Sequence, residues 1–301
     1  MESDDRFSTH GVRILKPVYI ARSSLWDGVF KVPRKSLILP LMPTIEKHKP
    51  GAFSWIELST SDQAAAKSFY TTLFNWTFQD SPMGPDDVYT MFSLNDHVVA
   101  AGYTIRGDEV SMGVPPHWNL YMSVESADDT ANRAGELGGK ILAPPFDVYN
   151  YGRMAVLQDP TGAVFSIWEA KDHIGLGVRD EPGSFCWADL STPDTQTASS
   201  FYSQLFGWSV EPGQDASGYL HIKNGEDFIG GIPPAQHRDP NTPPHWLIYI
   251  LVADCDASTA KAKELGARVY MGPMTMENVG RITVLADPQG AAFALFEPHR
   301  R

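Results

Sequence analysis

Hydrophobic and polar positions first alternate near residue 55 and then follow a helical period. In residues 55–60 (WIELST), Trp, Glu and Ser alternate with Ile, Leu and Thr, which is the two-residue period of a strand. From Ala66 to Phe74 the apolar residues recur at intervals of three and four, which predicts one apolar helical face. Asp62 stands just before this face, where a carboxylate can cap the free N–H groups of a helix. The pattern therefore predicts a strand, a turn and a helix.

The same pattern returns at residues 187–208, with 12 of 22 positions identical to residues 55–76. Pro116-His117-Trp118 returns as Pro244-His245-Trp246, and the segment from Gly152 returns from Gly280, both at an offset of 128 residues. The second copy also keeps the helix cap, as Asp194. A repeat of this length indicates tandem domains, because solenoid repeats have periods of about 20–50 residues.

The order of predicted elements divides the chain into two α+β domains. Residues 51–170 form the first, 171–182 a linker and 183–298 the second. Within the first, strands are predicted at 89–94, 98–105, 119–124, 152–157 and 164–168, a helix at 127–137 and a loop at 106–118. Each domain therefore reads as two β-α-β-β-β units. Gly230-Gly231 predicts close strand packing or a bulge.

Residues 1–50 differ from the rest of the chain. They have no repeat partner, and five prolines interrupt their short apolar runs. Acidic residues at positions 2, 4 and 5 do not fit the basic start of a secretory signal. We expect an N-terminal extension with little structure up to residue 41; the alternative is an arm that packs on a partner subunit.

Charge and cysteine content narrow the classes of function. The net charge is −12; residues 1–50 carry +4, so the remaining residues carry −16. Such an acidic body would repel nucleic acid and anionic membranes, while it could favour cationic ligands or serve solubility alone. No apolar run is long enough for a membrane span, and two cysteines make no disulfide framework. We expect a cytoplasmic protein, either a monomer or a homodimer.

The repeated motifs resemble those of a known superfamily. The pattern WxxLST, an Asp, FYxxLF and a closing Trp, followed by PPHW and DPxGAxF, resembles the glyoxalase, bleomycin-resistance and extradiol-dioxygenase proteins, also called vicinal oxygen chelate proteins. The subgroup it is most similar to has two tandem domains. The resemblance covers residues 50–298 and implies that each pair of β-α-β-β-β units curves its sheet around a cleft. In catalytic members a divalent metal held by His, Glu or Gln occupies that cleft.

The positions that hold this metal in the family carry other residues here. They correspond to Trp55, Asn119 and Ser166 in the first domain, and to Trp187, Leu247 and Ala294 in the second. Trp, Leu and Ala do not bind a hard divalent ion, and neutral Ser and Asn bind it weakly. We therefore expect no metal and no other cofactor; a divalent metal in a shifted site is the alternative.

Glu57 and His117 are the candidate catalytic residues. Alternate residues of a strand share a face, so Glu57 is expected beside Trp55, and His117 beside Asn119 and Tyr121. The two could meet across the first cleft as an acid–base pair, and Asp189 and His245 repeat them in the second. Three alternatives stay open for this pair: a structural role, contact with a small molecule, or a metal site.

Aromatic residues and two arginines complete the predicted ligand sites. Flat rings can stack on a ligand or simply fill the core, and each arginine can hold an anion or a neighbouring acid. Trp118 and Trp246 have the opposite parity and should pack under the helices. The first cleft is expected to be lined by Trp55, Glu57, His117, Asn119, Tyr121, Arg153, Ser166 and Trp168, and the second by Trp187, Asp189, His245, Tyr249, Arg281 and Phe296.

The preferred function at this level is binding of a small molecule without a metal, in the manner of bleomycin-resistance proteins. The first cleft is expected to be the better site, because the second is more apolar. One alternative is a lyase, isomerase or dioxygenase-type enzyme that uses Glu57 and His117, with or without a metal. A regulatory or interaction protein on the same scaffold is the other.

Overall fold

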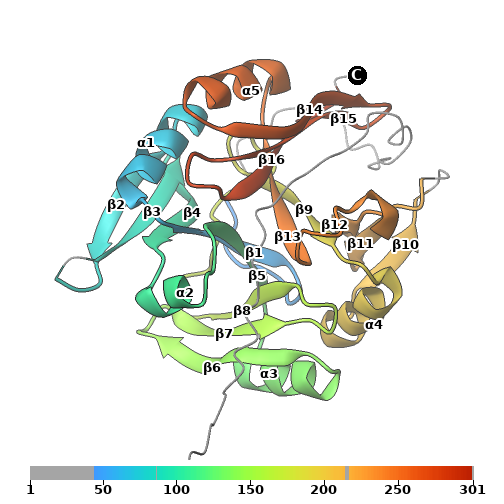
Figure 1. Cartoon of the computed structure of the whole chain (residues 1–301). Helices are drawn as coiled ribbons and strands as arrows, with labels where there is room; N and C mark the ends of the chain where they lie inside the picture. Colours follow the sequence, from blue (N-terminus) through green and yellow to red (C-terminus); the bar gives the residue numbers. More distant parts are fainter. Residues whose placement is uncertain (1–43, 86, 214–216, 300–301) are drawn as a thin grey trace, which may run out of the picture.

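The computed structural model describes residues 44–85, 87–213 and 217–299, and in these residues it consists of two sheets with helices on their outer faces (Figure 1). Each sheet has eight strands, in the orders β2-β3-β4-β1-β5-β8-β7-β6 and β10-β11-β12-β9-β13-β16-β15-β14. This confirms the α+β class and the two tandem domains. The extension expected at residues 1–41 lies outside the described residues.

The first domain is built from two β-α-β-β-β units that meet where β1 pairs antiparallel with β5. The second unit begins at β5. Residues 106–118, predicted from sequence as a loop, contain the short helix α2 and the first two residues of β5. Strand β2 was not predicted. The elements are β1 (Phe53–Thr60), α1 (Gln63–Phe74), β2 (Thr77–Pro82), β3 (Val88–Leu94), β4 (His97–Thr104), α2 (Gly107–Ser111), β5 (His117–Ser123), α3 (Ala127–Glu136), β6 (Lys140–Val148), β7 (Gly152–Gln158) and β8 (Val164–Ala170).

The second domain repeats this plan. Its units meet at the antiparallel pair β9 and β13. In place of α2 the connection before β13 carries a single 3-10 turn, Ala235–His237. The elements are β9 (Phe185–Ser191), α4 (Thr195–Phe206), β10 (Ser209–Pro212), β11 (Leu220–Asn224), β12 (Asp227–Ile232), β13 (His245–Leu251), α5 (Cys255–Glu264), β14 (Arg268–Met276), β15 (Gly280–Ala286) and β16 (Ala292–Pro298).

The helix caps form as the sequence predicts. The carboxylate of Asp62 accepts a hydrogen bond from Ala65 N–H over 2.9 Å, and Asp194 accepts one from Thr197 N–H over 3.0 Å. The Ser126 hydroxyl oxygen caps α3 in the same way. Each interaction satisfies a donor that would otherwise be unpaired in the first turn. The buried residues of α1 are those of the predicted apolar face.

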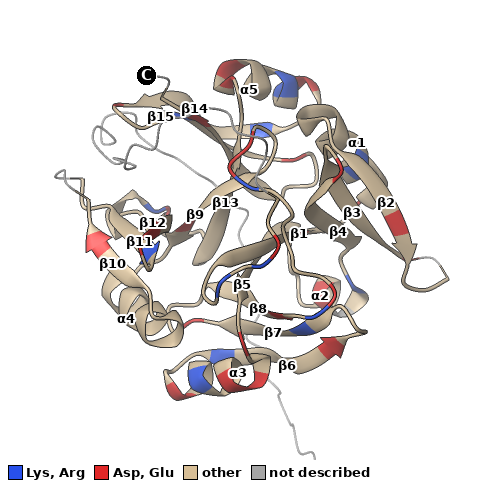
Figure 2. Ribbon diagram, turned by 180° about the vertical axis from the view of Figure 1, so that it is seen from behind, with Lys and Arg blue, Asp and Glu red and all other residues tan. Residues whose placement is uncertain are grey.

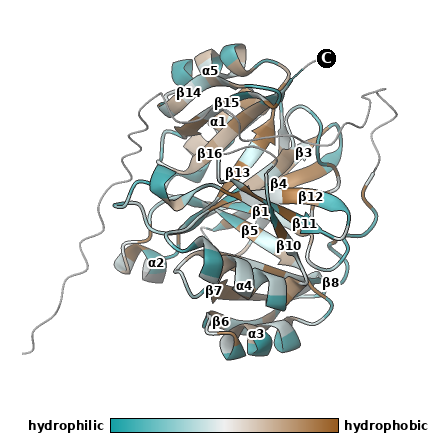
Figure 3. Cartoon of the chain, turned by 90° about the vertical axis from the view of Figure 1, so that its right-hand side faces the viewer, coloured by the Kyte–Doolittle hydropathy of each residue, from teal (hydrophilic) through white to brown (hydrophobic). Residues whose placement is uncertain are grey.

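The first helix of each domain packs on the sheet of the other domain. Phe69 and Phe74 of α1 contact Phe293 of β16, with ring centroids 6.3 and 6.1 Å apart. In the same way Phe201 and Phe206 of α4 contact Phe165 of β8. One hydrophobic cluster consequently runs through both domains. Figure 3 shows hydrophilic residues on the outward sides of α3, α4 and α5. The two domains therefore share a core.

A symmetric pair of hydrogen-bonded bridges joins the domains inside this core. Tyr70 of α1 donates to the carboxylate of Asp287 over 2.9 Å and accepts from the indole of Trp118. Tyr202 of α4 makes the equivalent bond to Asp159 over 3.0 Å and accepts from Trp246. The FY, PHW and DPxG motifs thus meet at the interface. Trp118 and Trp246 are buried against the helices, as their parity predicts.

The last residues of the N-terminal extension also join the two domains. Ile45 N–H donates to the Gly177 carbonyl, and His48 contacts the Leu176 carbonyl over 3.0 Å. Lys49 bonds Asp227 of the second domain over 2.6 Å. Residues 44–50 are therefore packed on both the linker and the second sheet.

Candidate functional site

Each domain carries a buried carboxyl group between two tyrosine hydroxyls on the concave face of its sheet. In the first, Tyr89 and Tyr121 donate to the two oxygens of Glu57 over 2.6 and 2.7 Å. We call this arrangement the tyrosine–carboxylate clamp. Its members come from β1, β3 and β5, which are not consecutive strands in the chain. The register confirms the predicted shared face, since Trp55 lies opposite Tyr121 and Glu57 opposite Asn119.

The second domain has the same clamp with a shorter acid. Tyr219 and Tyr249 donate to the two oxygens of Asp189 over 2.6 and 2.7 Å, and the indole of Trp187 donates to one of them. Sequence reasoning named Glu57, Tyr121, Asp189 and Tyr249 but missed Tyr89 and Tyr219. Those two tyrosines stand 130 residues apart, within the region where the repeat offset changes from 132 to 128, so no exact repeat marked them.

One glycine compensates for the shorter acid. Gly231 lies opposite Asp189, and Ala101 lies opposite Glu57. A Cβ at position 231 would lie 1.8 Å from the Tyr219 hydroxyl, so this tyrosine crosses directly over the glycine. Aspartate is one methylene shorter than glutamate, and its tyrosine must come closer to the strand to reach it. The close packing predicted for Gly230-Gly231 is present for this reason.

Burial sets the protonation of both acids. Desolvation raises the pKa of Glu57 and of Asp189, because a carboxylate loses its hydration in the interior. The hydrogen bonds from the tyrosines act in the opposite direction, since they stabilise the charged form. Burial and the neighbouring carboxylate also raise the pKa of Tyr121 and of Tyr219. The tyrosines are therefore donors to the acids at ordinary pH.

Among the described residues no hydrogen bond joins Glu57 to His117, although the two lie close enough for His117 to act on the pKa of Glu57. His117 lies opposite Ser59, and its Nδ1 donates to the Pro115 carbonyl over 2.8 Å. Its Nε2 lies 3.2 Å from the side-chain oxygen of Asn119. The glutamate oxygens instead accept from the two tyrosines. The imidazole bonds near the start of its own strand, and the acid–base role of Glu57 and His117 stays a prediction.

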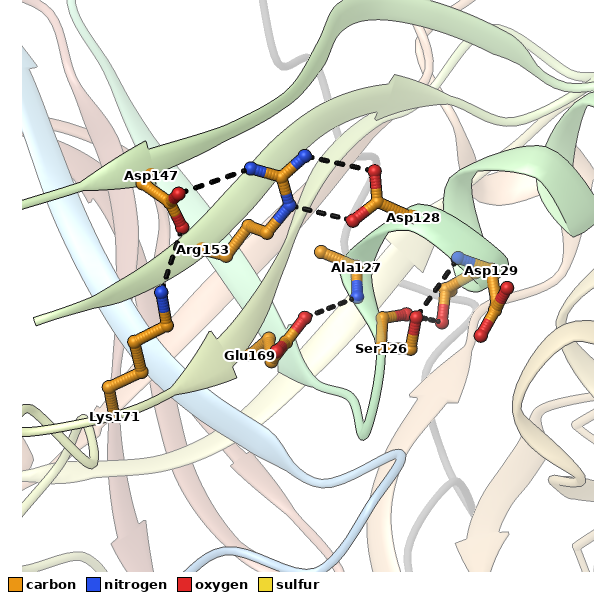
Figure 4. A network of polar contacts seen from close by, with 9 residues as sticks. Ser126, Ala127, Asp128, Asp129, Asp147, Arg153, Glu169 and Lys171 are labelled. Atoms are coloured by element: carbon orange, nitrogen blue, oxygen red, sulfur yellow. Dashed lines mark hydrogen bonds and ion pairs between the residues drawn. The ribbon is translucent and has the colours of Figure 1, made fainter. Parts of the chain in front are cut away.

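Arg153 and Arg281 lie on the helix side of their sheets and not in the clefts. Arg153 makes two hydrogen bonds to the carboxylate of Asp128 in α3 and lies 3.6 Å from Asp147 (Figure 4). Arg281 holds Asp256 of α5 with both Nε and Nη2. The register places Arg153 opposite Glu169, which caps α3, whereas Trp168 points to the other face. Their prediction as ligand contacts is corrected to an ion-pair role.

The linker covers the aromatic end of the first cleft. His173 packs edge-to-face on Trp55, with ring centroids 4.7 Å apart, and its carbonyl accepts the Trp168 indole N–H over 2.8 Å. The backbone of residues 171–177, which we call the strap, bonds Tyr151 at one end and Ser54 at the other. Burial lowers the pKa of His173 to about 4, so the ring is neutral near pH 7. Trp55 and Trp168 are therefore packed beneath the strap.

The second cleft contains a pocket of about 100 Å³. Asp189 and His245 both line it, as does Tyr249. Much of the wall is apolar and forms a hydrophobic cluster separate from the shared core. Phe296 and Trp187 pack against this cluster. The apolar lining consists of Leu247, Met271, Met276, Ile282 and Val284.

A shallower groove of about 280 Å³ lies elsewhere, at the junction of the domains. Its walls include Gly51, the helix cap Ser126 and Phe206 at the end of α4. The acids along it, Glu125 and Asp129, are exposed. A ligand site usually combines an apolar wall with a few buried polar groups. The pocket of the second cleft meets this description, so we take it as the candidate site.

The residues in the two clefts do not fit a three-ligand metal site. Within the described residues, no group of three or more His, Cys, Asp or Glu could hold a metal ion. Ser166 is buried beside Tyr121 and Ala294 beside Tyr249, at the places that the family's metal positions occupy. Glu57 and Asp189 are already held by tyrosines, and Asp239, the other acid that lines the second pocket, accepts hydrogen bonds from Asn241. Three protein ligands are the usual minimum for a catalytic metal.

Comparison with known proteins agrees with the fold and the repeat. Residues 52–167 match the Glyoxalase/Bleomycin resistance protein/Dioxygenase superfamily, and residues 187–296 match a glyoxalase-like domain. The chain is 38% identical over 262 residues to CFP32 of Mycobacterium bovis, whose name describes it provisionally as a glyoxylase; 85% of this chain and 98% of that protein are covered. The chain therefore belongs to the glyoxalase, bleomycin-resistance and dioxygenase superfamily, in a tandem two-domain form.

Two further proteins resemble this chain. The anthracycline biosynthesis protein DauV of a Streptomyces species is 34% identical, over 82% of this chain and 94% of that protein. The Mn(II)-bound glyoxalase from Novosphingobium aromaticivorans is 14% identical, with a TM-score of 0.57 over 82% of each chain. The second likeness shows the fold alone. Among the described residues, no helix is long and apolar enough to cross a membrane.

Proposed function

We propose that this protein binds a small, largely apolar ring compound in the cleft of its second domain, without a metal. The observation that carries the proposal is the pocket itself. Five aliphatic and thioether side chains form its apolar wall, and a buried carboxyl group held by two tyrosines lies in it. Methionine side chains adapt their shape to a ligand, and a few fixed polar groups give it an orientation.

The size of the pocket and the names of the relatives support a flat ring. A dry cavity of about 150 Å³ accommodates benzene, so a pocket of about 100 Å³ would take part of one ring of a larger molecule, with the rest of the molecule outside it. DauV is named for anthracycline biosynthesis. Anthracyclines contain fused planar rings, and an aromatic ring of this kind matches the wall of methionine, isoleucine and valine.

The two domains supply a matched pair of variants for testing this proposal. Leu247 lies opposite Asp189 in the pocket, and Asn119 lies opposite Glu57 at the same place in the first domain. Leu247→Trp should fill the pocket, whereas Asn119→Trp should leave it unchanged. We expect a hydroxylated anthraquinone to raise the melting temperature of the wild type and of Asn119→Trp, and to have no effect on Leu247→Trp.

Isothermal titration of the same three proteins gives the affinities. Binding that is lost in Asn119→Trp and kept in Leu247→Trp would place the ligand in the first cleft. If neither the anthraquinone nor a smaller aromatic probe binds any of the three, a ring compound is the wrong ligand class.

An acid–base enzyme in the same pocket is the second candidate. Asp189 and His245 both line the pocket, burial raises the pKa of Asp189, and burial lowers the pKa of His245. A carboxyl group and an imidazole whose pKa values are shifted toward each other are suited to donate and accept a proton. The test is turnover of a methylglyoxal–thiol adduct. An enzyme would lose turnover in Asp189→Asn while the fold persists; absence of turnover in the wild type would favour the binding role.

A further inference from the structure

We infer that the ligand of the second-domain pocket carries an anionic oxygen group, and that Arg238 binds it. This inference rests on the proposed function, because it specifies the ligand of the same pocket. The loop between β12 and β13, residues 233–244, closes one end of the pocket. Arg238 and Thr242 of this loop both line it.

Arg238 has hydrogen-bonding capacity that the protein leaves unused. One terminal nitrogen donates to the Thr242 carbonyl, while Nε is buried and has no partner among the described residues. In that part of the chain no carboxylate lies within the 4.0 Å of an ion pair with this guanidinium. Arg153 and Arg281, by contrast, each hold a carboxylate. A partly buried guanidinium without an acid is a ready receptor for an external anion.

The Thr242 hydroxyl is a second unsatisfied group in the same loop. The residue is 6% exposed, and its Oγ1 has no hydrogen-bond partner within the structure as described. Burial of such a group is unfavourable unless a partner is supplied. An oxygen atom of a ligand, bound with a small adjustment of the loop, would give both Arg238 and Thr242 an acceptor.

The acids of the pocket leave this end open to an anion. Asp239 also lines it, but its carboxylate accepts two hydrogen bonds from Asn241. In β9, Asp189 precedes Ser191 by two residues, and Ser191 faces His245 at the loop end. Two residues of a strand span roughly 7 Å.

These features define a ligand class with two ends. The planar guanidinium fork binds a carboxylate through two parallel hydrogen bonds, and an acidic phenol or enol oxygen would suit it as well. The apolar wall of Leu247, Met271 and Ile282 takes the ring. The structure thus favours a ring compound with one negative charge, such as an aromatic carboxylate.

The first domain lacks this receptor and provides the control. Its corresponding connection carries Arg106, whose side chain is exposed over the ring of Tyr103 at 5.8 Å. Val114 occupies the place of Thr242, three residues before the shared histidine. Substitution of Arg106 therefore removes an equal charge without touching the pocket.

The test compares 2-naphthoate with its neutral isostere 2-naphthamide by isothermal titration near neutral pH. We expect the wild-type protein to bind the carboxylate at least about tenfold more tightly, as charged hydrogen bonds generally provide. Arg238→Met should bind the carboxylate and the amide with about equal affinity. Its affinity for the amide should stay within about twofold of the wild-type value. Arg106→Met should keep the full preference.

The outcomes separate this inference from the proposed function. If the wild type binds both probes equally, or if Arg238→Met retains the preference, the anion inference is wrong while ring binding stands. If neither probe binds, and Leu247→Trp behaves like the wild type, the proposed pocket itself is wrong. A preference that Arg106→Met loses would assign the anion to the first domain.

Discussion

The two clefts of this protein share the tyrosine–carboxylate clamp and differ in the segment that covers it. Both contain a carboxyl group clamped between two tyrosines, with Glu57 in the first and Asp189 in the second. In the first, the strap places His173 over Trp55. In the second, a loop with Arg238 borders a pocket of about 100 Å³. The clamp is thus part of the shared scaffold, and the covering segments distinguish the domains.

This comparison separates the conserved geometry of a repeat from its chemistry. The repeated motifs FY, PHW and DPxG lie at the interface between the domains, where Tyr70 and Tyr202 each reach the opposite domain. The pocket of the second domain combines the repeated residues Asp189 and Tyr249 with Arg238 of the loop at residues 233–244. The repeat therefore supplies the scaffold of the pocket, and the loop supplies what distinguishes it from the first cleft.

The largest expected effect tests whether the two domains form one folding unit. Phe165 and Phe293 occupy equivalent places, and each packs against the helix of the opposite domain. Phe165→Ala and Phe293→Ala should each lower the free energy of unfolding by about 3–5 kcal/mol. Because the core is shared, urea unfolding followed by tryptophan fluorescence and by circular dichroism should give one coincident transition. Two separate transitions would show independent domains.

The next largest effect is expected from His173 in the strap, which should make the free energy of unfolding depend on pH. Burial lowers the pKa of His173 from 6.5 to about 4 in the folded state. The unfolded chain then binds more protons below pH 6.5, so stability falls as the pH drops from 6.5 toward 4. The loss should approach about 3 kcal/mol.

The contribution of this histidine is isolated by substitution. His173→Gln should lack this part of the acid destabilisation, whereas replacement of the exposed His299 by Gln should keep it. Urea unfolding of the three proteins across this pH range provides the measurement. Equal pH profiles for the wild type and His173→Gln would contradict the buried neutral state of the ring.

A smaller effect on the free energy of unfolding is expected at Gly231, beside the clamp acid, and a longer acid should partly reverse it. Gly231→Ala places a methyl group against the Tyr219 hydroxyl and should cost about 1–3 kcal/mol, as overpacking does. The first domain pairs Ala101 with the longer Glu57. The double variant Gly231→Ala, Asp189→Glu should therefore recover part of the loss in a double-mutant cycle. Strict additivity of the two changes would refute the proposed compensation.

The smallest effect is expected at the arginines on the helix side. Arg153→Met and Arg281→Met remove exposed ion pairs, which contribute little to stability in water. Each should lower the melting temperature only slightly and leave the affinity for a ring compound within about twofold. If Arg281→Met loses more affinity than this and the control Arg153→Met does not, Arg281 contacts the ligand after all.

Much of the fold followed from local patterns in the sequence. The alternation in residues 55–60, the apolar face of residues 66–74 and the capping aspartates define a strand and a helix without any tertiary information. Their return after about 130 residues predicts a second copy of the domain. Strand β2 was missed because all six of its residues are exposed, so it carries no alternating pattern.

Only part of the site could be predicted from the sequence, because its contacts depend on which distant strands become neighbours in the sheet. Parity placed Trp55, Glu57 and Tyr121 on one face, and the register confirms it. The partner of Glu57 was misjudged, since Tyr89 lies on β3, two positions from β1 across the sheet. No local period relates those strands. The direction of Arg153 was likewise decided by Asp128, which a helix brings over the sheet.

The sequence by itself thus determined the elements, the tandem repeat and the face of each strand, because these depend on interactions between near neighbours. The tertiary structure decided that each first helix packs on the opposite domain, that His173 covers the first cleft and that the second remains a pocket. Those outcomes depend on the path of the strap, whose ends are bonded to Tyr151 and Ser54, and on the path of residues 233–244, where Arg238 bonds the Thr242 carbonyl. Short-range patterns cannot specify such contacts, since loop conformation follows the surfaces on which it packs.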